Sequence, residues 1–138
     1  MPKYSRYSKK SIGVVWKKAP DVFKNVKLLK ASLGLGWVNM KNVFCFRSYG
    51  TQTRAVARIW GLGKIWQLAL SLQPSYILEV ISEKYDLLNQ DEKNKILLHE
   101  LSHIPKNFSG ALVPHYRGRK RNFRKLVKTL IQQYNKIK

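Results

Sequence analysis

Apolar residues recur along most of the chain with the period of either a helix or a strand. Steps of three and four residues between apolar positions indicate helices that bury one face. The capping residues support one of these helices in particular, because Asn89 or Asp91 can start it and Pro105 ends it. The pattern therefore predicts helices over 21–33, 91–104 and 123–134, with a short helical turn over 65–72.

Three runs rich in β-branched and aromatic residues indicate strands. The runs over 43–46 and 55–60 are separated by a short turn-forming stretch, which predicts that they pair as a hairpin. The run over 76–81 carries a single charge, Glu79, and is the most continuously apolar, as expected of a central strand. That assignment leaves residues 56–60 as the edge strand. The predicted fold class is α+β, with an N-terminal helix, a small three-stranded mixed sheet, a helix over 91–104 and a C-terminal amphipathic helix.

The length of the chain allows one folded domain. Its 138 residues, 44% of them hydrophobic, supply a single modest core. The first residues are basic and lack periodicity, so we expect a flexible basic arm over 1–11 and a single domain over 12–138. The N-terminus has no apolar signal region, and the longest apolar stretch is far shorter than the roughly 20 residues that cross a bilayer. Together with the lone cysteine, Cys45, these features predict a cytoplasmic protein with no membrane partner.

The sequence His-Glu-Leu-Ser-His at 99–103 lies at the end of a predicted helix. Two histidines four residues apart lie on one helix face and can bind one ion. A hydrolytic zinc site takes three protein ligands and leaves a position for water. No Asp or Glu follows Glu100, and the chain after the motif contains helix-breaking residues that let it turn back. The candidate ligands of one Zn²⁺ per chain are therefore His99, His103 and His115, the three histidines of the chain.

This arrangement would serve peptide hydrolysis. Glu100 would take a proton from the zinc-bound water and pass it to the leaving amine. Tyr116 and Arg117 follow the last histidine and are candidate donors to the oxyanion, although Tyr116 also fits a packing role. A structural zinc site fits less well, because such sites usually fill four positions and no cysteine lies nearby in the sequence.

The motif with a downstream histidine resembles the zincin class of metallopeptidases. The strings ARIWGLGKIWQLAL, YILEVISEKYDLL and ILLHELSHIPKNFSGALVPH are more specifically similar to small metallopeptidases of phage and archaeal genomes. The resemblance implies a minimal zincin-like domain, with Glu100 as the base, the three histidines as ligands and an extended peptide paired with the edge strand. The layout is also similar to SprT-like proteases, which cut proteins attached to DNA. The metzincin spacing and its later Met-turn are absent from the sequence.

The charge of the chain adds a second class of partner. Lys and Arg number 27 against seven Asp and Glu, a formal net charge of +20, and such a surface attracts phosphate backbones. DNA or RNA is therefore an expected partner beside a polypeptide substrate, and a solvated helix face is the alternative. Trp60 and Trp66 fit either base stacking or packing. The candidate nucleic-acid-binding residues are Arg117, Arg119, Lys120, Arg121, Arg124, Lys125 and Lys128.

Three functions are compatible with these features. The first is a zinc-dependent endopeptidase that acts on nucleic-acid-associated proteins. The alternative is a basic nucleic-acid-binding module whose metal site is structural or degenerate. A metal-dependent nuclease fits least, because Mg²⁺ sites use several carboxylates and this candidate site offers mainly imidazoles.

Overall fold

The computed structural model describes residues 13–115 and 121–138. The predicted basic arm over 1–11 lies outside these residues and stays a prediction. Among the helices that the structure describes, none is both long and apolar enough to cross a membrane. In chain order the elements are β1 (Val15–Lys18), α2 (Pro20–Leu33), the 3₁₀ turn η1 (Met40–Asn42), β2 (Val43–Tyr49), β3 (Ala57–Gly61), α3 (Lys64–Leu70), β4 (Tyr76–Ile81), α4 (Ser82–Tyr85), α5 (Gln90–Leu101) and α6 (Arg121–Ile137).

The strands form one mixed sheet of four strands in the order β1-β2-β4-β3. The α+β class is confirmed, and β4 is central and β3 an edge strand, as predicted. The predicted hairpin is wrong, because β2 pairs in parallel with β4 and β3 pairs antiparallel with the other side of β4. β2 continues to Tyr49, which pairs with Val15 of β1, so part of the stretch expected to be a turn is strand. The prediction of three strands missed β1. This strand has four residues, two of them lysines, and all four are exposed.

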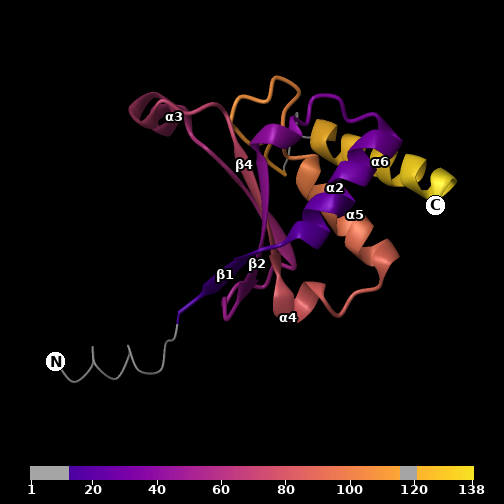
Figure 1. Ribbon diagram of the computed structural model, residues 1–138. Coiled ribbons are helices and arrows are strands. Elements are labelled where there is room, and N and C mark those ends of the chain that lie inside the picture. Colours follow the sequence, from indigo (N-terminus) through magenta and orange to yellow (C-terminus); the bar gives the residue numbers. More distant parts are fainter. Residues whose placement is uncertain (1–12, 116–120) are drawn as a thin grey trace.

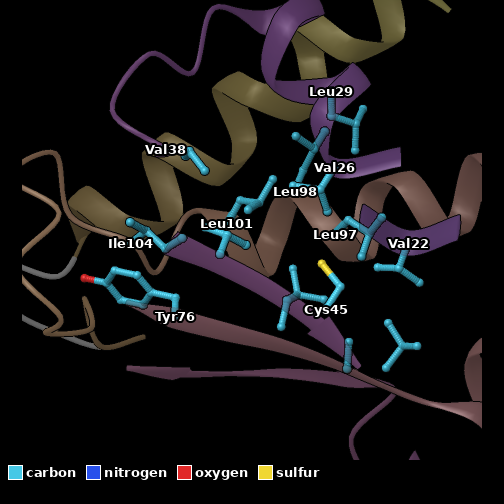
Figure 2. Close-up of a cluster of buried hydrophobic side chains, with 14 of the residues drawn as sticks. Val22, Val26, Leu29, Val38, Cys45, Tyr76, Leu97, Leu98, Leu101 and Ile104 are labelled. Atoms are coloured by element: carbon cyan, nitrogen blue, oxygen red, sulfur yellow. The ribbon is translucent and has the colours of Figure 1, made fainter. Parts of the chain in front are cut away.

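Helices α2, α5 and α6 lie together on one side of the sheet (Figure 1). α2 packs on β2, α5 packs on β3, and α6 lies against both α2 and α5. Alternate residues of β4, namely Tyr76, Leu78 and Val80, belong to the core cluster and are at most 1% exposed. Figure 2 shows apolar side chains of α2 and α5 meeting above the strands, among them Val22, Val26, Leu29, Leu97, Leu98 and Leu101.

The remaining helices match the pattern with small shifts. α3 fulfils the helical turn predicted over 65–72, and α6 fulfils the amphipathic helix predicted over 123–134. α2 ends where Gly34 adopts φ +64° and donates its backbone N–H to the carbonyl of Lys30. The single turn of α4 was not predicted. α3 projects away from the body of the molecule, beyond the ends of β3 and β4 (Figure 1).

Candidate metal centre

Helix α5 and the turn that follows it place the first two histidines. Its start is fixed by a capping box, in which the Asn89 side chain accepts from the backbone N–H of Glu92 and the Glu92 side chain accepts from that of Asn89. The helix ends at Leu101, earlier than predicted, and the chain continues through turns in which the N–H groups of His103 and Ile104 bond three residues back. One of these bonds joins the N–H of His103 to the carbonyl of Glu100 at 3.0 Å.

The chain returns to His103 through a second pair of hydrogen bonds. The backbone N–H of Val113 donates to the carbonyl of His103 at 2.8 Å, and His103 Nδ1 contacts the carbonyl of Val113. Since a carbonyl only accepts, this Nδ1 carries the proton and donates it. The lone pair of His103 is therefore on Nε2, the tautomer that a metal ligand with a backbone partner adopts.

Side chains of β4 and α3 hold the loop between His103 and Val113 in place. Gly110 has φ +97° and donates its N–H to the hydroxyl of Tyr76, which donates in turn to the carbonyl of Ala111, both at 2.8 Å. The amide of Gln67 donates to the carbonyls of Leu62 and Ser109. These two side chains fix the path of the loop toward the third histidine. Sequence reasoning did not identify them, because a strand tyrosine and a helical glutamine carry no signal of such a role.

The three histidines meet at one point. One ring nitrogen from each of His99, His103 and His115 lies within 4.8 Å of the others. The Nε2 atoms of His99 and His115 are 3.1 Å apart. His103 is buried, His99 is intermediate and His115 is exposed, so the group opens to solvent on the side of His115. The structure thus brings together all three residues that the sequence singled out.

The surroundings favour neutral imidazoles. Burial, reinforced by the other two rings, lowers the pKa of His99 to about 4. Burial also lowers the pKa of His103, against the opposing effect of its bond to Val113. Metals bind the neutral form of histidine. Three imidazole nitrogens with an open side are a donor set that can hold a metal ion and leave a position for water or substrate.

Phe123 of α6 closes the other side of the histidine group. Its ring stacks on His103 with centroids 4.3 Å apart and meets His99 and His115 edge-on at 5.3 and 5.2 Å. Its side chain is 3% exposed. The sequence placed Phe123 only at the start of an apolar stripe, and nothing in the pattern distinguishes a residue that packs on candidate metal ligands from one that packs on the core.

The structure describes the predicted base, Glu100, but only some of the predicted basic residues. Glu100 lies in the last turn of α5, and burial raises the pKa of its carboxyl to about 7. Tyr116, the candidate oxyanion donor, lies outside the described residues, as do Arg117, Arg119 and Lys120. Arg121 is the first residue of α6. The remaining three candidates are exposed on that same helix, and they are Arg124, Lys125 and Lys128.

Comparison with known proteins gives one match. A family model described as "Putative phage metallopeptidase" matches residues 14–136 of the chain. No curated protein and no solved structure matches it. The match covers the sheet, the histidine group and both helices that enclose it.

Proposed function

The chain belongs to the family described as "Putative phage metallopeptidase", and from this premise we propose that it is a zinc-dependent endopeptidase. The observation that carries the proposal is the convergence of His99, His103 and His115 on one point, with a ring nitrogen of each within 4.8 Å of the others. His99 comes from the last turn of α5, His103 from the turn that follows it, and His115 from a loop that is hydrogen-bonded back to His103.

Zinc is the metal that this donor set fits best. Imidazole suits zinc, whereas Mg²⁺ and Ca²⁺ require several oxygen ligands. The described histidine group contributes nitrogen atoms alone. Zinc bound there would act as a Lewis acid toward a carbonyl and would lower the pKa of water. The bond of His103 to Val113 and the packing of Phe123 hold the rings in place for that purpose.

Glu100 supplies the proton transfer in this proposal. It follows His99 directly, at the end of the helix, and burial raises the pKa of its carboxyl to about 7. A carboxylate with a pKa near the working pH can both accept a proton and give it up. Glu100 would accept a proton from the attacking water and deliver it to the amine that leaves when the peptide bond breaks. A bound dication nearby would stabilise its ionised form and keep it ready to accept.

The outer edge of β3 offers a place for the polypeptide substrate. The N–H of Ile81 donates to the carbonyl of Val56, and the N–H of Leu62 donates to that of Ser75. Because backbone groups alternate along an antiparallel pair, the N–H and C=O of Ala57 and Ile59 therefore point away from β4. An extended peptide that pairs with this edge would gain backbone hydrogen bonds with little demand on its sequence.

Nucleic-acid-associated proteins are the substrate class that we propose on the basis of charge. Arg124, Lys125 and Lys128 are exposed on α6, the helix whose Phe123 contacts the histidines. A phosphate backbone on α6 would bring attached proteins to the metal centre. The same observation supports the alternative function, a nucleic-acid-binding module with a structural or degenerate metal site.

The substitution Glu100→Gln separates the two functions. It removes the base and leaves the imidazoles, so we expect hydrolysis of an unfolded protein substrate to fall by at least about a thousandfold while zinc content stays unchanged. Glu92→Gln is the matched control on the same helix, because glutamine preserves the capping box. Hydrolysis that persists in Glu100→Gln would reject the role of this residue. A wild-type protein that binds zinc and nucleic acid but cleaves no polypeptide would favour the alternative.

A further inference from the structure

The face of the sheet opposite the helices carries exposed aromatic side chains. On this face Trp16 is 54%, Phe44 47% and Trp60 48% exposed, and Phe46 is half-buried. Ile77, between them on β4, is 40% exposed. Neither the core nor the metal centre uses these residues. Large apolar side chains gathered on one exposed face indicate a binding surface.

Strand register arranges this face in rows. Phe44 lies beside Ile77 on β4, and Ile77 lies beside Trp60 on β3. In the next row Phe46 lies between Lys18 on β1 and Glu79 on β4. Phe44 and Phe46 are two residues apart on one strand, which places them roughly 7 Å apart along the sheet. The aromatic rings are therefore spaced along the face rather than packed into one cluster.

Three adjoining hollows lie between these rings. A hollow of about 340 Å³ is lined by Trp16, Phe46, Trp60, Ile77 and Glu79. A second hollow, of about 500 Å³, is lined by Phe44, Trp60 and Ile77 together with the residues that follow α3. A third hollow, of about 310 Å³, is lined by Phe44 and Phe46 together with residues at the start of α2. Phe44, Phe46 and Trp60 thus form the walls between neighbouring hollows, each open to solvent and large enough for a planar ring.

The middle of the face is fixed and free of exposed negative charge. Glu79 is 1% exposed and accepts from Nε1 of Trp60 and from Nε of Arg58, both at 2.8 Å. Burial alone would raise the pKa of Glu79, but these hydrogen bonds outweigh it and the pKa is lowered, so the carboxylate stays ionised and paired. The Arg58 guanidinium lies 5.0 Å from the centre of the Trp60 ring. Trp60 is therefore held in one orientation. Arg58 is paired with Glu79, and the exposed charge that lines the hollows is that of Lys18, beside Phe46.

We propose that this face, which we call the open face, binds single-stranded nucleic acid with its bases stacked between Trp16, Phe44, Phe46 and Trp60. The net charge of +20 selects a polyanion. It also opposes pairing of the open face with a second copy of the same chain. Spaced aromatic rings with basic neighbours are the surface on which successive unpaired bases stack. Duplex bases are stacked on each other and cannot enter the hollows.

This proposal does not depend on the peptidase activity. The open face lies across the sheet from α2 and α5, and so from the basic residues of α6. A peptidase with no affinity for single strands would refute this inference alone. Conversely, a protein that binds single strands through this face and cleaves nothing would refute the proposed function alone.

The test compares a labelled 15-nucleotide oligo-dT, the matching oligo-U and a 15-base-pair duplex in fluorescence anisotropy with the full chain. We expect both single strands to bind more tightly than the duplex. In the double variant Trp16→Ala with Phe44→Ala, the Kd for oligo-dT should rise at least about tenfold, because stacking contributes about 1–3 kcal/mol per base. The control is Ile65→Ala with Leu68→Ala, which removes exposed apolar side chains without aromatic rings, 73% and 66% exposed, from α3. Its Kd should stay within about twofold of wild type.

Two further measurements keep the test decisive. Trp16→Leu with Phe44→Leu keeps apolar bulk but removes the flat rings, so it should lose affinity while its urea midpoint matches wild type. An unchanged Kd for oligo-dT in either folded double variant would overturn the proposal. Equal affinity of the wild type for duplex and single strand would also overturn it. Binding to anionic phospholipid vesicles or to poly-glutamate, with none to oligo-dT, would assign the open face to a different partner.

Discussion

The two faces of the sheet are made by alternate residues of the same strands, yet they meet different surroundings. On β4, Leu78 and Val80 point into the core and are fully buried, whereas Ile77 between Tyr76 and Leu78 is 40% exposed. The helical face is covered by α2 and α5 and leads to the candidate metal centre. The open face is covered by no described element and carries the aromatic hollows.

This difference separates two uses of apolar side chains. On the helical face they stabilise the fold and hold the histidines, as Phe123 does by stacking on His103. On the open face the same kinds of side chain remain half exposed, so they contribute less to the free energy of unfolding. Their positions are better explained by a ligand than by the core. Equivalent substitutions on the two faces should therefore have very different effects.

The largest expected contrast is between two phenylalanines. Phe123→Ala removes a ring that is 3% exposed and packs on all three histidines. We expect it to lower the free energy of unfolding by about 3–5 kcal/mol and to weaken zinc binding. Phe44→Ala, at 47% exposure on the open face, should cost less than about 1 kcal/mol. Urea denaturation of both variants measures this, and equal losses would contradict the distinction between the faces.

A smaller effect is expected in the loop that joins the motif to the third histidine. Gly110 has φ +97°, and a Cβ there would collide with the carbonyl of Leu62 and the amide of Gln67. Gly110→Ala should displace the loop, costing roughly 1–3 kcal/mol and raising the Kd for zinc. Gly36→Ala is the control, because nothing lies within 4 Å of its added Cβ. Zinc titration of both variants should show weaker zinc binding only in Gly110→Ala. Unchanged zinc affinity in that variant would show that the loop does not position the site.

The smallest effect is expected at the outer edge of β3. Ala57→Pro removes an N–H that points away from β4, so the fold should be retained. If substrate pairs there, kcat/KM for an unfolded protein should fall about two- to tenfold, the value of one hydrogen bond. Arg58→Pro is the control, because its N–H faces β4 and its loss should lower the urea midpoint. Unchanged cleavage by a folded Ala57→Pro protein would place substrate elsewhere.

Much of the site could be predicted because its chemistry is local in sequence. His99 and His103 are four residues apart at a helix end, and His115 was the only other histidine available. The order of the helices and the central place of β4 also followed from periodicity. These features depend on spacing and residue type, which a sequence displays directly.

The features that sequence reasoning missed depend on long-range pairing. The hairpin prediction failed because β4, later in the chain, lies between β2 and β3. The support of the loop by Tyr76 and Gln67 joins segments more than 30 residues apart. Exposure was equally hidden, because Ile77 and Leu78 look alike in sequence and differ only in what covers them. Tertiary contacts decide each of these, and no local pattern encodes them.

The measurement that tests the central claim most directly is the metal content of the purified full chain. Elemental analysis of the wild type should find about one zinc per chain, as three imidazole ligands with an open position require. His115→Ala should lose most of that zinc while its helices remain, because His115 reaches the group from the loop and is exposed. A native protein that contains no zinc and binds none on titration would contradict the account. Full retention of zinc in His115→Ala would show that the three histidines do not act as one site.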